Sequence, residues 1–224
     1  MTAAWPSATL LGQLDAPDRD ALLALGSPRA YPTGAALVSQ GSSDAGTFAL
    51  LDGCAKVFGH SADGRAVLLS IRPGGDLIGE LAALDDKPRS ASVVAATRVV
   101  AQVITQQAFL GYLRDRPAAA TAIHRAVLAE FRRATHHRVH LNGAPTAVRL
   151  AVVLSHLMEI LGQPCGEGVR IDVPLSQPEL ASLVGVSEPT LHRTLTELRG
   201  RKVIRTRYRR LIVSDPAELR ALIG

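Results

Sequence analysis

The chain has 224 residues, of which 47 % are hydrophobic, 4 % aromatic and 20 % charged, and its formal net charge is +5. This is a globular composition, far from the low hydrophobicity of disordered chains. No apolar run approaches the roughly 18–20 residues that span a bilayer. No basic region followed by an apolar stretch opens the chain, as it would in a secretory signal. We therefore expect a soluble, cytoplasmic protein that has no membrane partner.

Two cysteines, Cys54 and Cys165, stand far apart and outside any Cys-x-x-Cys pair. By themselves they cannot hold a four-thiolate cluster or a structural zinc ion. His136 and His140 are spaced to lie one helical turn apart and could clip a metal. Solvent-facing histidines on an arginine-rich helix are the simpler interpretation, so we predict no metal site.

The first predicted element is a short amphipathic helix over residues 16–26, ended by Gly26. Short β-type runs then alternate with turn signals up to residue 107. These runs are Thr47–Leu51, Ala55–Phe58, Val67–Ile71 and Val99–Ile104. Their spacing predicts an all-β barrel or sandwich over residues 1–107. One helical turn, Gly79–Leu84, is predicted between strands.

This inserted turn and the segment after it carry groups suited to a phosphate. Gly79 allows a close approach to the backbone, and N–H groups at a helix start attract anions. Arg89 adds a cation and Ser90 a hydroxyl, while Glu80 can accept a hydrogen bond from a ribose 2′-hydroxyl. A surface ion pair between Glu80 and Arg89, worth less than about 1 kcal/mol, explains the same residues. The residues alone leave both interpretations open.

A long helix is predicted over residues 108–142, because no glycine follows Gly111 and no proline follows Pro117 before Leu141. A heptad-like stripe runs along it through Val127, Phe131, Ala134, Arg138 and Leu141. Arg138 interrupts the apolar character of this stripe. We expect the helix to pair with its copy in a homodimer. Packing of the stripe onto the chain's own β-domain is the alternative.

Asn142-Gly143-Ala144-Pro145 breaks the helix and forms a predicted hinge before a third domain, residues 143–224. Beyond this hinge the sequence predicts an amphipathic helix over Thr146–Leu161, a strand over Val169–Pro174 and a β-hairpin over Val203–Ser214.

Between the predicted strand and hairpin, residues 177–196 meet the packing demands of a helix-turn-helix. Ala181 occupies the fifth position, where only a small side chain fits between the helices. Gly185 occupies the ninth, where the turn needs a positive φ. Ser176 and Ser187 can cap the two helices. A basic hairpin directly after this motif indicates a winged helix.

Eight basic residues lie between Arg193 and Arg210, against the single acid Glu197. Such a block indicates a polyanionic partner, because each neutralised phosphate releases counterions; a solvated basic face is the alternative. For double-stranded DNA, Arg193 would make a bidentate contact to guanine worth about 1–3 kcal/mol, and Glu188 would accept from a cytosine amine. Glu188 could instead pair with Arg193 or favour the helix start. The expected phosphate contacts are Ser176, Thr190, Arg205, Arg207, Arg209 and Arg210.

Gly79-Glu80-Leu81 followed by Pro88-Arg89-Ser90-Ala91 resembles the phosphate-binding cassette of cyclic-nucleotide-binding domains. Together with the helix-turn-helix, the chain resembles the CRP/FNR (cyclic-AMP receptor protein) family of bacterial transcription regulators. The resemblance implies an α+β fold with an N-terminal, jelly-roll-like β-roll, a long dimerisation helix and a C-terminal winged helix-turn-helix. It implies a homodimer on a two-fold symmetric operator, with cAMP as the effector. It also implies RNA polymerase as a partner and association with the nucleoid when DNA is bound.

The family's binding roles fall on the cassette residues Gly79, Glu80 and Leu81, with Arg89 and Ser90 on the cyclic phosphate. The polar pair that meets the base falls on Ala134 and Thr135. Thr135 can hydrogen-bond an adenine edge and Ala134 cannot, so the choice between cAMP and cGMP stays open.

Two segments depart from the family pattern. Glu188-Pro189 stands where well-known members carry Arg-Glu, so we expect a different operator, and the wing lacks the usual glycine at its tip. No nucleophile elbow, zinc-protease, Walker A or Rossmann fingerprint occurs, so we predict that the protein is not an enzyme. The iron–sulfur sensors of the family need a cysteine cluster that is missing here. The alternative is a constitutive DNA-binding regulator of the same family whose effector pocket is vestigial or serves another ligand.

Overall fold

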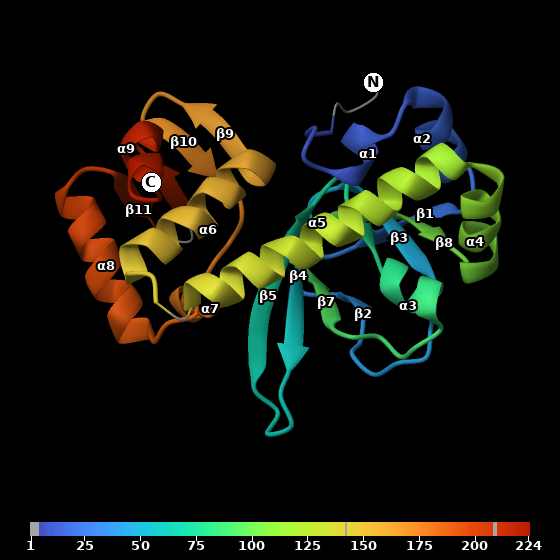
Figure 1. The fold of residues 1–224 in the computed structure, drawn as a ribbon, viewed down its shortest axis with the longest axis horizontal. Helices are drawn as coiled ribbons and strands as arrows, with labels where there is room; N and C mark the ends of the chain where they lie inside the picture. Colours follow the sequence, from blue (N-terminus) through green and yellow to red (C-terminus); the bar gives the residue numbers. More distant parts are fainter. Residues whose placement is uncertain (1–4, 142, 208–209) are drawn as a thin grey trace. The chain divides into compact units, whose positions relative to one another are not determined.

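A computed structural model describes residues 5–141, 143–207 and 210–224 of the chain. It divides the chain into two units, Met1–Glu130 and Phe131–Gly224, and each is described by itself. The predicted α+β architecture is confirmed: antiparallel sheets lie in the N-terminal unit, a long helix follows them, and a helix-turn-helix lies in the C-terminal unit (Figure 1).

Two four-stranded antiparallel sheets form the N-terminal β-roll, in the strand orders β1-β8-β3-β6 and β2-β7-β4-β5. The first sheet contains β1 (Ser27–Tyr31), β3 (Thr47–Asp52), β6 (Leu77–Ile78) and β8 (Val99–Ile104). The second contains β2 (Ala36–Val38), β4 (Cys54–His60), β5 (Ala66–Pro73) and β7 (Ser92–Ala95). Side chains of both sheets, among them Phe48, Leu50, Ala55 and Val93, meet in one buried cluster. The four predicted β runs are confirmed as β3, β4, β5 and β8.

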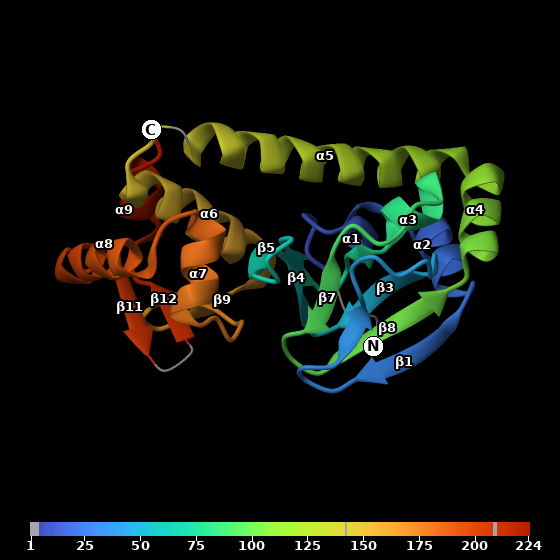
Figure 2. The same cartoon turned by 90° about the horizontal axis from the view of Figure 1, so that it is seen from below.

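Helices cover one side of this β-roll and bury a second cluster against it (Figure 2). They are α1 (Leu10–Gln13), α2 (Ala16–Leu23), α3 (Glu80–Asp85), α4 (Gln106–Asp115) and α5 (Pro117–Leu141). Phe109 on α4 and Ile123 on α5 are buried in this cluster together with Leu77 of β6. The short helix α3 buries Ala82 and Ala83 and contacts α4, which fixes the position of the predicted phosphate cassette, while Leu81 and Leu84 stay exposed.

The long helix is confirmed but begins later than predicted, because residues 106–141 form two helices instead of one. Arg116 breaks the run with φ −133° and ψ 78°. The ring of the following Pro117 disfavours helical geometry at Arg116 while suiting the first turn of a new helix. The start of α5 packs onto the chain's own β-roll through Ala119 and Ile123, whereas Phe131 of the predicted stripe is exposed. The side chains of Arg138 and Leu141 lie outside the described part.

The C-terminal unit combines helices with a third antiparallel sheet, in the strand order β11-β12-β10-β9. Its helices are α6 (Thr146–Leu161), α7 (Gln177–Val184), α8 (Glu188–Gly200) and α9 (Pro216–Ala221). Its strands are β9 (Gly162–Cys165), β10 (Gly168–Ile171), β11 (Ile204–Arg207) and β12 (Arg210–Val213). The strand predicted over 169–174 ends at Ile171, short of the proline at its end. β11 and β12 form the predicted wing beside α8 (Figure 2).

The local signals of the helix-turn-helix are confirmed. Ser176 forms a capping box with Glu179 at the start of α7. Ser187 accepts from the N–H of Thr190 at the start of α8. Gly185 has φ +70°, and Ala181 is buried. Across the described ranges, no helix has both the length and the apolar character needed to cross a membrane.

Candidate nucleotide pocket and nucleic-acid interface

A cavity of about 100 Å³ lies where α3 and the loop after it face the second sheet. All five predicted cassette residues line it: Gly79, Glu80, Leu81, Arg89 and Ser90. Ligand pockets usually enclose about 300–1,000 Å³, so a nucleotide must widen this cavity or extend through its open side. The structure thus brings the five cassette residues that the motif predicted together around one small cavity.

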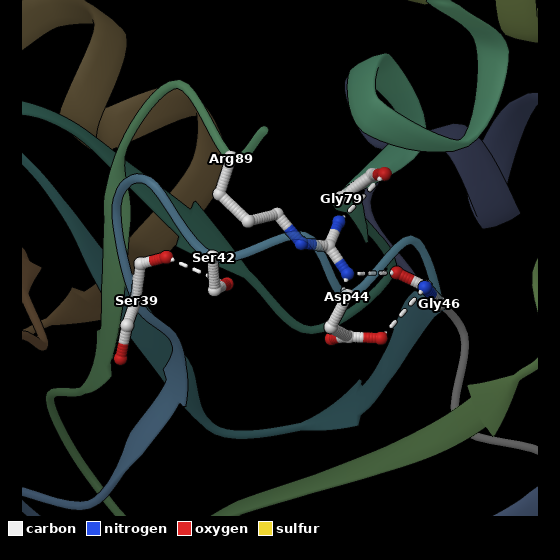
Figure 3. A network of polar contacts seen from close by, with 6 residues as sticks. All are labelled: Ser39, Ser42, Asp44, Gly46, Gly79 and Arg89. Carbon is white, nitrogen blue, oxygen red and sulfur yellow. Dashed lines mark hydrogen bonds and ion pairs between the residues drawn. The ribbon is translucent and has the colours of Figure 1, made fainter. Parts of the chain in front are cut away.

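Arg89 is 3 % exposed, and its guanidinium is held by groups of the protein (Figure 3). Nη1 donates to the Gly79 carbonyl at 2.9 Å. Nη2 donates to Asp44 Oδ2 at 3.0 Å and to the Gly46 carbonyl. Gly79 has φ +84°, and a Cβ there would overlap Arg89 Nη1, so glycine is needed for this close approach. Figure 3 shows Arg89 reaching across from the segment after α3 to the loop that precedes β3.

That loop, between β2 and β3, positions Asp44. The Ser42 hydroxyl donates to the Ser39 carbonyl at 2.9 Å, and the backbone N–H of Arg89 donates to the Ser42 carbonyl at 2.9 Å. Asp44 accepts from the N–H of Gly46 at 3.1 Å. Burial acts to raise the pKa of Asp44, but its hydrogen bonds to Gly46 and Arg89 outweigh burial and lower it. The carboxylate therefore stays ionised opposite Arg89.

The ion pair of Arg89 is thus made with Asp44, and no Glu80–Arg89 pair occurs within the described residues. Asp44 could not be predicted, because a carboxylate 45 positions before the arginine in the chain carries no local signal. One donor is left over: the Nε–H of Arg89 is buried and has no hydrogen-bond partner in the described part of the chain. Such an orphaned donor, in an arginine that lines a cavity, is the arrangement in which an added acceptor gains most.

A second charged group, which the sequence did not predict, is centred on Arg72, which lines the same cavity as Glu80. Nη1 of Arg72, on β5, lies 3.5 Å from Asp76 Oδ2 and 3.4 Å from Glu130 Oε2, on α5. Burial raises the pKa of Glu80, the charge of Arg72 acts against this rise, and Asp76 and Glu130 reinforce it. Burial also opposes the charge on Arg72, but Glu130 and Asp76 raise the pKa of its guanidinium.

Thr135 belongs to the C-terminal unit, on the second half of α5. It is exposed, and its hydroxyl donates to the carbonyl of Phe131 at 2.9 Å. Its contact with a nucleobase stays a prediction.

In the helix-turn-helix, α8 buries one face and exposes the other. Leu191, Leu195 and Leu198 point into the core, while Glu188 and Arg193 are exposed. Neither Glu188 nor Arg193 forms a hydrogen bond or ion pair within the described ranges, so the alternative Glu188–Arg193 pair is not formed. Arg193 is thus an uncommitted guanidinium on the outer face of the second helix.

Two predicted phosphate contacts on the motif also serve local structure. The Ser176 hydroxyl donates to Glu179 Oε2 at 3.0 Å, in addition to the two hydrogen bonds of the capping box. The Thr190 and Ser187 hydroxyls lie 2.9 Å apart and share a hydrogen bond. Ser176 is exposed and Thr190 is half-buried, and they lie at the starts of α7 and α8.

The basic block divides into structural and uncommitted residues. Arg199 bonds the Leu195 carbonyl and the hydroxyls of Thr196 and Thr206, and Arg201 pairs with Glu218. These two arginines hold the wing and α9 onto α8.

The wing arginines share one carboxylate. Arg205 Nη1 and Arg207 Nη2 each lie 3.3 Å from Glu167 Oε1, in the turn between β9 and β10. Glu167 was not predicted. Arg209 lies outside the described residues, as does the side chain of Arg210.

Comparison with known families agrees with this arrangement. Residues 28–116 match the cyclic nucleotide-binding domain, and residues 148–222 match the Crp-like helix-turn-helix domain. The chain is therefore a DNA-binding transcription regulator with a cyclic nucleotide-binding domain. It belongs to the CRP/FNR family. This is a family of transcription regulators, and no group of three or more potential metal ligands occurs within the described residues.

Several relatives align over most of their length. A CRP-like cAMP-activated global transcriptional regulator of Mycobacterium tuberculosis is 28 % identical over 192 residues, 86 % of each chain. The cyclic AMP receptor protein of Thermus thermophilus is 27 % identical over 177 residues, 79 % of each chain. In fold, the c-di-GMP responsive global regulator CLP of Xanthomonas campestris matches with a TM-score of 0.74 at 20 % identity, over 89 % of this chain and 99 % of that one. The names of these similar proteins thus include both cAMP and c-di-GMP.

Proposed function

We propose that this protein is a homodimeric transcription regulator whose affinity for DNA is set by cAMP bound in the N-terminal pocket. The observation that carries the proposal is Arg89: a buried guanidinium that lines the cavity with one unpartnered Nε–H. A cyclic phosphate supplies the anionic acceptor that this donor lacks, and charge-assisted hydrogen bonds of this kind are about twice as strong as neutral ones.

The remaining cassette residues take complementary roles in this proposal. Ser90 donates its hydroxyl to the phosphate, and Glu80 accepts from the ribose 2′-hydroxyl. Gly79 lets Arg89 approach the cassette, and Leu81 gives an apolar wall. Thr135 contacts the base. The names of two relatives, one cAMP-activated and one a cyclic AMP receptor, support adenine over guanine in this role.

The homodimer rests on an exposed apolar face of α5. Leu128 is 54 % and Phe131 69 % exposed, and they lie three residues apart, on one side of the helix. Thr135 follows four residues after Phe131, on the same side. Large exposed apolar side chains on a long helix are typical of an interface with another chain, so this face pairs two copies and places both Thr135 side chains near the interface.

On DNA, α8 enters the major groove and Arg193 reads a guanine. Ser176, Thr190 and the wing residues Arg205, Arg207, Arg209 and Arg210 contact phosphates, while Glu188 contacts a cytosine. A homodimer presents two such helices to a two-fold symmetric operator about one helical turn, roughly 34 Å, apart. RNA polymerase is the further partner. The nucleotide acts only through its different affinity for the two states of the dimer.

Two measurements test this proposal. Calorimetry with cAMP, cGMP and cyclic di-GMP identifies the effector, and we expect heat of binding with cAMP at one site per chain. Fluorescence anisotropy on duplexes selected from a random pool then measures DNA affinity with and without nucleotide, and we expect tighter binding with cAMP. Absence of heat with all three nucleotides, for a folded dimer that binds DNA, would contradict the gating.

The same geometry supports a second candidate function, a regulator of the same kind whose pocket is vestigial and whose DNA binding does not depend on a nucleotide. Asp44 and two backbone carbonyls already occupy most of the Arg89 donors, and the cavity is small. In that case DNA affinity is equal with and without nucleotide.

A further inference from the structure

Arg72 forms part of the wall between two cavities of the N-terminal unit. One is the nucleotide pocket, and the other is a smaller space lined by Asp76 and Glu130. Arg72 and Glu80 line both. One guanidinium from β5 thus lies close to a carboxylate from α3, one from the loop after β5 and one from α5.

Only two of these carboxylates form ion pairs with Arg72. Asp76 and Glu130 lie 3.5 and 3.4 Å from its Nη1, and the three side chains are largely shielded from solvent. Glu80 forms no ion pair within the described residues, yet its charge interacts with that of Arg72. Burial, Asp76 and Glu130 favour the neutral form of the Glu80 carboxyl, and the positive charge of Arg72 favours its ionised form.

We propose that Arg72 is a positioning residue of the nucleotide site, which holds the Glu80 carboxylate as a charged acceptor for the ribose 2′-hydroxyl and thereby gives the pocket its preference for ribonucleotides. This proposal rests on the function proposed above. An ionised carboxylate accepts a stronger hydrogen bond from a hydroxyl than a neutral carboxyl does. Glu130, on α5, pairs with the same guanidinium. Its negative charge therefore weakens the electrostatic effect of Arg72 on Glu80.

A purely structural role for Arg72 makes a different prediction. If the guanidinium only fastened β5 to α5, its loss would lower the melting temperature and leave the relative affinities for two nucleotides unchanged. The discriminating quantity is therefore the ratio of the dissociation constants of 2′-deoxy-cAMP and cAMP, measured by calorimetry between pH 6 and pH 9. This ratio reports the contribution of the 2′-hydroxyl to binding, because any loss of affinity common to both nucleotides cancels.

In the wild type we expect a ratio of about ten at high pH, which falls at low pH as Glu80 becomes protonated. Arg72→Met removes the cation, so the fall moves to higher pH and the ratio at intermediate pH drops. Arg72→Lys keeps the charge and restores most of the ratio. Glu130→Gln removes an anion, so the fall moves to lower pH. Glu80→Gln is the matched control. It gives a low ratio at every pH because the amide carries no charge and does not titrate.

The opposite shifts of Arg72→Met and Glu130→Gln are the signature of the proposal. Folding of each variant is checked by circular dichroism. If Arg72→Met does not fold, the shift to lower pH in Glu130→Gln decides alone. A wild-type pH profile in both folded variants, or shifts in the same direction, would overturn the role of Arg72. Absence of cAMP binding by the wild type would instead overturn the proposed function.

Discussion

Arginines meet carboxylates in both units, but under opposite conditions. Arg89 in the N-terminal pocket is 3 % exposed and is gripped by Asp44 and two backbone carbonyls. Arg205 and Arg207 in the wing have side chains 56 % and 66 % exposed, and each lies 3.3 Å from the same carboxylate oxygen of Glu167. Exposed pairs are screened and contribute about 0.2–1 kcal/mol, whereas a buried charge that loses its partner is costly.

The difference separates two kinds of anion recognition. The pocket offers one guanidinium in a fixed position, which suits a single phosphate with defined geometry. The wing offers exposed cations, Arg205 and Arg207, that can each meet any phosphate of a duplex. We therefore expect loss of the pocket arginine to act nearly all-or-none and substitutions in the wing to act in small, salt-dependent steps.

The largest expected effect comes from Arg89→Leu. Truncating one partner of a buried charge pair costs about 2–5 kcal/mol, so cAMP affinity should fall by about 30-fold or more in calorimetry. Arg114→Leu, an exposed arginine on α4 away from the cavity, is the matched control and should bind normally. Circular dichroism confirms folding, and Arg89→Lys replaces it if Arg89→Leu is unfolded. Unchanged affinity in a folded variant would mean that the pocket arginine does not touch the ligand.

Next in size is Arg193→Ala on the outer face of α8. Loss of a bidentate contact to guanine costs about 1–3 kcal/mol, so affinity for the selected operator should fall by about 10- to 100-fold. Affinity for unrelated duplex should change little, because Arg193 reads a base. Arg220→Ala, exposed on α9, should leave both unchanged. An equal loss on both duplexes would make Arg193 a phosphate contact like those of the wing.

Both regions also show what the sequence could and could not predict. Contiguous signals succeeded: the bounds of α6 agree at both ends, and Gly185 and the two serine caps lie as expected. The arginines could be named because basic residues in a motif carry a direct chemical meaning. The carboxylates that meet arginines could not be named, because each is brought close only by tertiary folding. They are Asp44, Glu130 and Glu167.

Elements were missed where periodicity was absent. β1 contains a proline and exposes four of its five residues, so it shows no alternation of apolar and polar positions. β6 has only two residues. The break at Arg116 was missed because Pro117 was interpreted as part of one helix, although the residue before a proline resists helical geometry.

A smaller effect is expected at Asp44, whose side chain is 62 % exposed. Asp44→Asn removes the charge that competes with a phosphate for Arg89 but keeps an acceptor for Gly46. Because the pair is partly solvated, cAMP affinity should rise by only about two- to fivefold in calorimetry. Asp63→Asn, exposed at the tip of the β4–β5 hairpin, is the matched control. A loss of affinity would mean that Asp44 orients Arg89 for the ligand instead of competing with it.

The pH dependence of this gain has a defined sign. The pKa of Asp44 is lowered from its ordinary value, so its pairing energy is present above the unfolded-state pKa of about 4 and is lost only as pH falls through the lower folded value. The ratio of wild-type to Asp44→Asn dissociation constants should therefore be constant from pH 5 to pH 8. A ratio that approaches one near pH 5 would show that Asp44 is protonated there.

The smallest expected effect is in the wing. Glu167→Gln frees Arg205 and Arg207 from their shared carboxylate, so DNA affinity should rise by about two- to fivefold at low salt. The plot of log affinity against log salt should steepen by about one to two, because each additional phosphate contact contributes about 0.9 to the slope. Glu159→Gln, exposed on α6, changes the net charge equally and serves as the control. An equal gain in both variants would reduce the effect to net charge, whereas a gain confined to Glu167→Gln, and lost at high salt, would show that a weak internal pair limits how many phosphates the wing can reach.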